Sequence, residues 1–157
     1  MTEFDRTRAY WQAFLDSLKS ETHPATYEAW SFGDGAEMAD RLGALVKAGI
    51  KTATAGLVWD YEHDGSAYPQ VGGYSVILDG AGMPLCIIQT TEVTVKPFQE
   101  VDAQFAYDEG EGDRSLAYWR QAHWKFFSRV CLVIDRLPQE DMPVVCERFR
   151  LVYAADA

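Results

Sequence analysis

The hydrophobic pattern of this chain changes its period at Gly49, and that change limits which folds it can adopt. Before Gly49, apolar residues recur at helical intervals over residues 3–19 and 35–48, with Asp34 as the expected N-cap of the second helix. After Gly49, the composition is typical of strands over residues 52–59, 74–78, 85–95, 130–137 and 144–153. Residues 114–127, capped by Asp113, return to a helical period. The sequence therefore predicts an α+β fold: a small β-barrel with N-terminal helices and one helical crossover.

Length and composition favour one domain. The chain has 157 residues, which fits a single core, and residues 1–30 are expected to form an N-terminal helical extension. No apolar run is long enough to cross a bilayer, and the N-terminus has no signal-like pattern. We therefore expect a cytoplasmic protein that does not bind membranes. The three cysteines are widely spaced among apolar residues, which predicts buried free thiols rather than a metal site.

The net charge limits the class of ligand. Fourteen basic residues against twenty-four acidic ones give a charge of −10. This balance argues against a protein that grips long nucleic acid without sequence preference, because such proteins carry a basic face. It leaves room for a nucleotide-sized ligand or for a local basic pocket.

The segment that follows the second helix, residues 49–54, combines a lysine with two threonines. Strand alternation places Thr52 and Thr54 on one face, and Lys51 is expected at the rim of the strand, within reach of solvent. A lysine beside a threonine hydroxyl would form a base–nucleophile pair if its pKa were lowered. The alternative interpretation is a solvated lysine followed by threonines that favour strand structure.

A second candidate is the acidic segment 108–113, which holds four carboxylates and two glycines in six residues. A carboxylate here would orient a lysine or act as a general acid or base. The alternative is an acidic helix cap in a solvated turn. Cation binding is a further alternative that stays open, although the segment lacks the ligand spacing of an EF-hand and no residue is assigned as a metal ligand.

Aromatic residues and one histidine supply further candidates. Trp30 and Phe32 would either pack in the core or stack on a nucleic-acid base. His123 lies on the apolar face of the third expected helix, where a structural role competes with a catalytic one. The phosphate-binding loop, the dinucleotide fingerprint, the serine-hydrolase elbow and the zinc-protease helix are all missing from the sequence.

Taken in order, a series of landmarks over nearly the whole chain resembles the ASCH domain family. The landmarks are Trp30-x-Phe32-Gly33, Ala39-Asp40-x-Leu42, Gly49-Ile50-Lys51-Thr52-Ala53-Thr54, Pro69-x-x-Gly72, Phe98-x-x-Val101-Asp102-Ala103-x-Phe105-Ala106, Glu109-Gly110-Glu111-Gly112-Asp113, Trp119, His123-x-x-Phe126-Phe127 and Glu147-Arg148-Phe149. The resemblance implies a PUA-like barrel with a cleft between barrel and helices that recognises RNA or a modified ribonucleoside.

The same resemblance implies roles for individual residues. Lys51, Thr54 and Glu109 match a catalytic lysine, threonine and glutamate, and the expected substrate-binding residues are Trp30, Phe32, Thr52, Glu111 and His123. No cofactor is implied. Because of the chain's length we expect a ribonuclease that acts on single-stranded RNA in the cleft. The alternatives are an N4-acetylcytidine amidohydrolase and a non-catalytic module that binds RNA or nucleotides.

Overall fold

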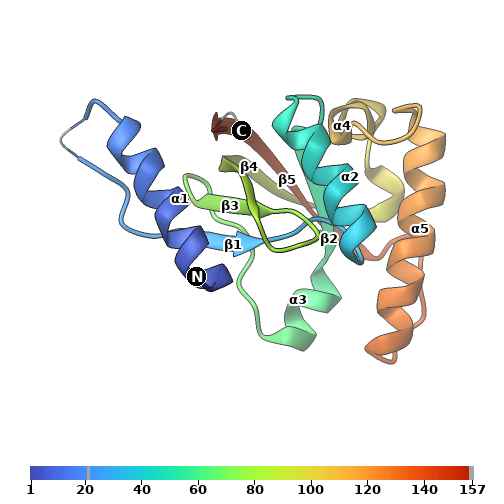
Figure 1. Ribbon diagram of the computed structural model, residues 1–157. Helices are drawn as coiled ribbons and strands as arrows, with labels where there is room; N and C mark the ends of the chain where they lie inside the picture. The colour runs from blue at the N-terminus through green and yellow to red at the C-terminus, as the bar shows by residue number, and fades with distance from the viewer. Residues whose placement is uncertain (21, 156–157) are drawn as a thin grey trace. The chain divides into compact units, whose positions relative to one another are not determined.

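The structure is a computed structural model that describes residues 1–20 and 22–155. Over these residues helices and strands are mixed along the chain, and five strands form one sheet in the order β1-β3-β4-β5-β2 (Figure 1). The predicted α+β class is confirmed. The chain folds as two compact units: one holds residues 1–49, 72–89 and those from 150 onward, and the other holds residues 50–71 and 90–149.

The first unit is built around an aromatic helix. α1 (Glu3–Ser17) begins with a capping box between Thr2 and Asp5 and buries Trp11 and Phe14. These rings pack with apolar residues of β3 (Tyr74–Leu78) and of the first part of β4 (Pro84–Pro97), namely Val76, Leu78 and Ile87. β1 (Glu28–Trp30) pairs in parallel with β3, which pairs antiparallel with β4. α2 (Ala36–Lys47) begins after Gly35, so the predicted cap at Asp34 is wrong by one residue.

The second unit holds a second core. β2 (Ala53–Leu57) pairs antiparallel with β5 (Pro143–Tyr153), so that Ala53 lies opposite Arg148 and Leu57 lies opposite Val144. Helix α5 (Leu116–Val133) packs Trp119, Phe127 and Cys131 into the same core as Ala53, Leu57 and Val144. The short helix α4 (Ala103–Glu109) contributes Phe105 and Ala106. One face of β2 is therefore turned towards this core.

Two predicted strands differ from the structure. The strand predicted over residues 52–59 ends at Leu57, where α3 (Val58–Asp64) begins. The strand predicted over residues 130–137 is wrong, because α5 continues to Val133. Cys131 follows Phe127 at a helical spacing and both are buried, whereas Leu132 and Val133 are more than 80% exposed. The apparent strand pattern came from these exposed apolar side chains.

Other differences concern helix starts and short elements. α5 is capped by the side chain of Ser115, not by Asp113 as predicted. β1, α4 and the single turn η1 (Phe98–Glu100) were not predicted, because three to seven residues are too few to show a period. Two expectations on composition can be compared directly with the structure. Cys86, Cys131 and Cys146 are buried free thiols, as predicted, and no described helix has the length and apolarity needed to span a membrane.

Candidate functional site

The second unit contains a buried group of four ionisable side chains, which we call the lysine cluster: Lys51, Glu109, Glu111 and His123. Lys51 Nζ lies 3.4 Å from Glu109 Oε2 and 3.1 Å from Glu111 Oε2. It also donates to the Glu109 backbone carbonyl at 3.3 Å. Lys51 is only 2% exposed, so the expectation that solvent reaches it at the rim is wrong. The structure thus brings Lys51 together with both glutamates of the acidic segment.

Backbone hydrogen bonds fix the segment that carries Lys51. Thr52 N donates to the Asp108 carbonyl at 2.8 Å, and Phe149 N donates to the Thr52 carbonyl at 3.0 Å. The Thr52 hydroxyl also donates to the Asp108 carbonyl, at 3.4 Å. The residues next to Lys51 are therefore held between the end of α4 and strand β5, which sets the direction of the lysine side chain before any charge is considered.

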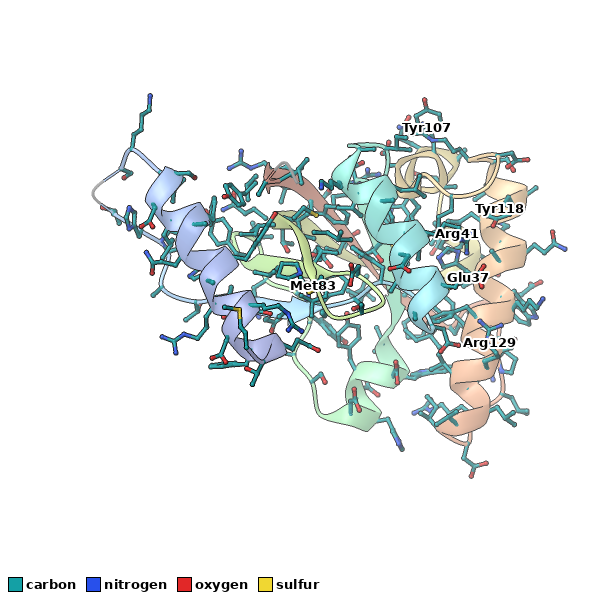
Figure 2. The ribbon with its side chains drawn as sticks, viewed as in Figure 1. Glu37, Arg41, Met83, Tyr107, Tyr118 and Arg129 are labelled. Atoms are coloured by element: carbon teal, nitrogen blue, oxygen red, sulfur yellow. The ribbon has the colours of Figure 1, made fainter. Side chains whose placement is uncertain are left out.

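The loop after α4 uses positive φ angles to place Glu111 beside Glu109. Gly110 (φ 74°) ends α4, Gly112 has φ 59° and Arg114 has φ 65°. A Cβ at Gly110 would lie 2.9 Å from the Ile50 carbonyl oxygen, and one at Gly112 would lie 2.5 Å from the Tyr118 ring. Figure 2 labels Tyr118 on α5 and Tyr107 on α4. The Arg114 guanidinium carbon lies over the Tyr107 ring, 3.6 Å from the ring centroid. Positive φ favours glycine at both positions, and at Gly110 the nearby Ile50 backbone also leaves no room for a side chain.

His123 joins the cluster from α5. Its ring stacks on Trp119 with centroids 4.2 Å apart. Nδ1 lies 2.9 Å from the Trp119 carbonyl oxygen, and Nε2 lies 3.2 Å from Glu109 Oε2. Because both ring nitrogens face acceptors, both act as donors when the ring is an imidazolium. Burial lowers the pKa of His123 more than any other single cause, but the charge and hydrogen bond of Glu109, the charge of Glu111 and the Trp119 carbonyl together raise it above its ordinary value.

The pKa values of the two glutamates are shifted in opposite directions. Burial favours a high pKa for Glu109, but the charges of Lys51 and His123 outweigh it and hold the pKa well below the ordinary range. For Glu111 burial raises the pKa, and the negative charge of Glu109 adds to that effect against the attraction of Lys51. The Glu111 side chain is 15% exposed, whereas that of Glu109 is 1% exposed. Glu109 is therefore a fixed anion, and Glu111 is the more accessible carboxyl and the one whose pKa is raised.

Two buried polar atoms of this region lack a partner among the described residues: Glu109 Oε1 and Trp119 Nε1. One is an acceptor and the other a donor. Buried groups of this kind are normally satisfied by ordered water or by a polar group of a ligand. The lysine cluster therefore has unused hydrogen-bonding capacity.

The cluster also offers a donor set for a cation. Glu109, Glu111 and His123 present ligand atoms within 4.8 Å of one another, and two carboxylates with an imidazole suit several divalent transition metals. However, the Lys51 ammonium already contacts an oxygen of each carboxylate. A divalent cation would have to bind next to that positive charge.

Thr54, the third residue of the expected catalytic group, points elsewhere. In the ladder Thr54 lies opposite Glu147, and Ala53 lies opposite Arg148. Directly opposed residues project to the same face, and successive residues project to opposite faces. Ala53 and Leu57 face the core that contains Trp119, so Thr54 and Glu147 project to the other side of β2. Glu147 is buried there and accepts a 2.7 Å hydrogen bond from Thr90.

The two expected aromatic contacts, Trp30 and Phe32, belong to the first unit. Their rings pack against each other with centroids 4.5 Å apart, and Phe32 is 3% exposed. Such burial is typical of core packing. A stacking role for either ring stays a prediction.

Arg148 was missed as a functional candidate, although it stands among the landmarks of the resemblance. Its guanidinium contacts Asp108 Oδ2 and lies 3.3 Å from Glu92 Oε2. It also lies over the Phe105 ring, 5.2 Å from the centroid. Alternation along β5 would have put it on the core face with Val144 and Cys146, and a cation at such a position is a signal that sequence analysis can use.

Comparisons of sequence and of structure with known proteins point to one family. A family model described as the ASCH domain matches residues 28–153. The crystal structure of an ASCH domain from Lactobacillus crispatus JV V101 is 35% identical in sequence, with a TM-score of 0.89 over 95% of both chains. A protein from Enterococcus faecalis V583 is 37% identical, with a TM-score of 0.85 over 94% of this chain and 88% of that chain. No curated protein sequence matches the chain. The expected PUA-like fold class is confirmed by these structural matches.

Proposed function

The chain belongs to the ASCH domain family, whose PUA-like fold generally binds RNA, and on this premise we propose that it is a ribonuclease that cleaves single-stranded RNA. The observation that supports the proposal most strongly is the contact between Lys51 Nζ and Glu111 Oε2 at 3.1 Å. An ammonium stabilises the negative charge that develops on a phosphate under attack, and a carboxyl with a raised pKa is better suited than an ordinary glutamate to take up and return a proton. RNA itself supplies the nucleophile, its 2′-hydroxyl.

Glu111 is the acid–base group in this mechanism. Its carboxylate takes the proton from the 2′-hydroxyl as that oxygen attacks the neighbouring phosphorus. The bond between phosphorus and the 5′-oxygen then breaks, and the carboxyl returns the proton to the departing 5′-oxygen. The products are a 2′,3′-cyclic phosphate and a 5′-hydroxyl, and the charges balance. Glu111 is assigned this role because it is more exposed than Glu109, at 15% against 1% of the side chain.

Glu109 and His123 are positioning residues in this proposal. The Glu109 carboxylate contacts both Lys51 and His123, so it fixes the ammonium on one side and the imidazolium on the other. Lys51 acts through its charge, because its side chain is almost completely buried. Its attraction to the reacting phosphate is strong for the same reason, since few water molecules screen it.

The amidohydrolase alternative requires Thr54 as the nucleophile and Lys51 as its base. The strand register places Thr54 on the face of β2 that carries Glu147, away from the core side that carries Ala53. The Thr52 hydroxyl is engaged with the Asp108 carbonyl. A substrate that brings its own hydroxyl fits this geometry better than a covalent threonine intermediate.

One oligonucleotide separates the three functions: a single-stranded RNA with one N4-acetylcytidine, analysed by mass spectrometry after incubation with the full chain. Backbone fragments ending in a cyclic phosphate would support the ribonuclease. An intact strand lighter by one acetyl group would establish the amidohydrolase, and an unchanged strand that still binds would establish a binding module. Either of the last two outcomes contradicts the proposal.

Variants then test the assignment of residues. Glu111→Gln keeps the size and the contact with Lys51 but removes the titrating group, and we expect its cleavage rate to fall by about 10²–10⁴-fold. Glu140→Gln is the matched control, because Glu140 is exposed, and it should cleave at the wild-type rate. Thr54→Val should also keep its activity. A 2′-O-methylated strand should resist cleavage; if it is cut as fast as the unmodified RNA, the 2′-hydroxyl is not the nucleophile.

A further inference from the structure

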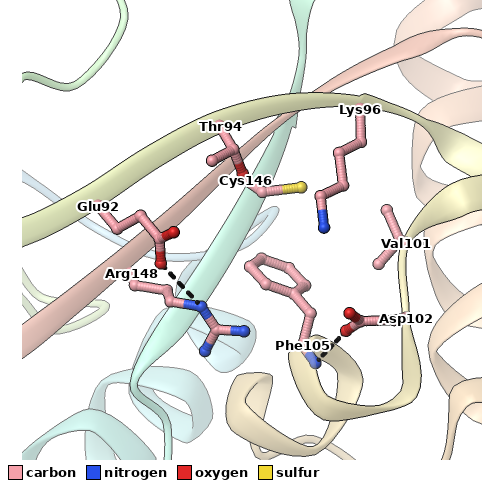
Figure 3. Close-up of a pocket in the computed structure, with 8 residues that line it drawn as sticks. All are labelled: Glu92, Thr94, Lys96, Val101, Asp102, Phe105, Cys146 and Arg148. Carbon is pink, nitrogen blue, oxygen red and sulfur yellow. Dashed lines mark hydrogen bonds and ion pairs between the residues drawn. The ribbon is translucent and has the colours of Figure 1, made fainter.

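A small cavity of about 110 Å³ lies in the second unit, between β4, β5 and the start of α4 (Figure 3). Lys96 and Thr94 line it from β4, Cys146 and Arg148 from β5, and Phe105 from α4. Figure 3 shows the Lys96 side chain extending into the space between Cys146 and Phe105. The lysine cluster shares none of these residues, so the cavity is a separate feature of the unit.

Strand alternation explains how the cavity is built. Thr94 and Lys96 are two residues apart on β4, and Cys146 and Arg148 are two residues apart on β5, so each pair projects from one face of its strand. The Phe105 ring closes the space from α4 and is itself 4% exposed. The walls are therefore set by regular secondary structure rather than by a mobile loop.

Two cations, Lys96 and Arg148, and two carboxylates, Glu92 and Asp102, line the cavity. Arg148 is offset by Glu92 and Asp108, whereas Asp102 keeps its negative charge while its carboxylate accepts a 2.9 Å hydrogen bond from Phe105 N. Burial raises the pKa of Cys146 to about 11, so its thiol is neutral. Within the described part of the chain, Lys96 has no ion pair. The Lys96 ammonium thus reaches a small cavity without an ion pair, and an anion that contacts it there has the Asp102 carboxylate as a neighbour.

We propose that this cavity is a subsite for one phosphate group, with Lys96 as the positioning residue and Thr94 and Arg148 as further donors. The volume of the cavity fits a compact anion. A volume of about 110 Å³ is that of about four water molecules, and it lies well below the 300–1,000 Å³ of sites for larger ligands. Four oxygens around one phosphorus match this space, whereas a whole nucleoside does not.

The assignment of the phosphate to RNA rests on the proposed function. Residues that line the cavity stand at the start of α4, and Glu109 stands at its end. Seven helical residues at 1.5 Å each separate the two by roughly 10 Å. The subsite would therefore bind a phosphate next to the scissile one. Lys96 would then keep the RNA chain in position for cleavage.

The subsite is tested first with inorganic phosphate alone. Titration of the full chain is followed by the ¹⁵N signals of the lysine ammonium groups and by calorimetry. We expect saturable binding in the wild type, at least a tenfold loss of affinity in Lys96→Met, and retention in Lys96→Arg, which keeps the charge. Lys125→Met, at an exposed lysine of α5, is the matched control and should bind as the wild type does. Equal binding by Lys96→Met and the wild type, with both folded, would overturn the subsite.

A second measurement tests the source of the phosphate. The affinity for a single-stranded RNA homopolymer is measured against salt concentration, and one lost phosphate contact should reduce the logarithmic slope by about 0.7 in Lys96→Met. An unchanged slope would contradict the assignment to RNA even if inorganic phosphate binds. Cleavage is scored separately in the same samples. A wild type that binds RNA through Lys96 but does not cut it would refute the ribonuclease and leave the subsite standing.

Discussion

Removing the charge of Lys51 is the most direct test of how the second unit is held together. Lys51→Met keeps most of the side-chain length and removes the ammonium that lies 3.4 Å from Glu109 Oε2 and 3.1 Å from Glu111 Oε2. Two carboxyls are then left side by side, and Glu109 is 1% exposed. The change therefore leaves a buried charge with one of its two cationic partners missing.

The size of the effect follows from burial. Removing one partner of a buried ion pair costs about 3–5 kcal/mol, because the remaining charge is desolvated without compensation. For a chain of this length each kcal/mol lowers the melting temperature by about 2–4 °C, so we expect a loss of roughly 6–20 °C. Lys125→Met, at an exposed position, should change stability by no more than about 0.5 kcal/mol.

The pH dependence gives a sharper criterion. In the wild type the folded pKa of Glu109 lies below its ordinary value of 4.5, so its stabilising contribution is complete above that pH and is lost as the pH falls through the folded pKa. In Lys51→Met the burial effect gains weight and the pKa of Glu109 rises. A carboxyl with a raised pKa is tolerated best when protonated. The deficit relative to the wild type should therefore be largest at neutral pH and should shrink towards acid pH.

Urea unfolding, followed by tryptophan fluorescence at a series of pH values, measures both quantities. A loss of less than about 1 kcal/mol at neutral pH would place this contact among exposed ion pairs and refute the reasoning. A deficit that does not shrink as the pH falls would do so as well, because it would point to lost packing rather than to an uncompensated carboxylate.

Two further predictions concern single ionisable groups. The imidazole of His123, followed by NMR, should titrate above 6.5, and its contribution to stability should be present below pH 6.5 and lost as the pH rises through the folded pKa. His123→Gln should remove that dependence, and titration below 6.5 would contradict an imidazolium that donates from both nitrogens. Burial raises the pKa of Cys86 to about 12 and that of Cys146 to about 11, so both should react with iodoacetamide far more slowly in the folded chain than in urea. Rapid labelling of either residue in the folded protein would be inconsistent with these environments.

Much of the fold could be predicted from local pattern. α1, α2, β4 and β5 lie within a few residues of the predicted segments, because each is long enough for its apolar residues to show a period. The five-residue strand β3 was predicted from its strand-like composition and from the turn residues that follow it. The predicted strand over residues 130–137 failed where exposed leucine and valine side chains imitated strand composition at the end of α5. α4 and β1 were missed because they are short and are stabilised by partners distant in sequence.

The candidate site, like the fold, could be predicted from the sequence only in part. The sequence by itself singled out Lys51 and the acidic segment, because a lysine at a strand start and closely spaced carboxylates are local features. The tertiary structure decided the rest. It buries Lys51, brings Glu111 and His123 to Glu109, and turns Thr54 to the other face of β2. Lys51 and Glu109 are 58 residues apart in sequence, and their contact depends on how α4 ends, how Gly110 turns the chain and how β2 registers with β5. Local pattern carries no information on such contacts, because each is fixed by packing between segments that the sequence keeps apart.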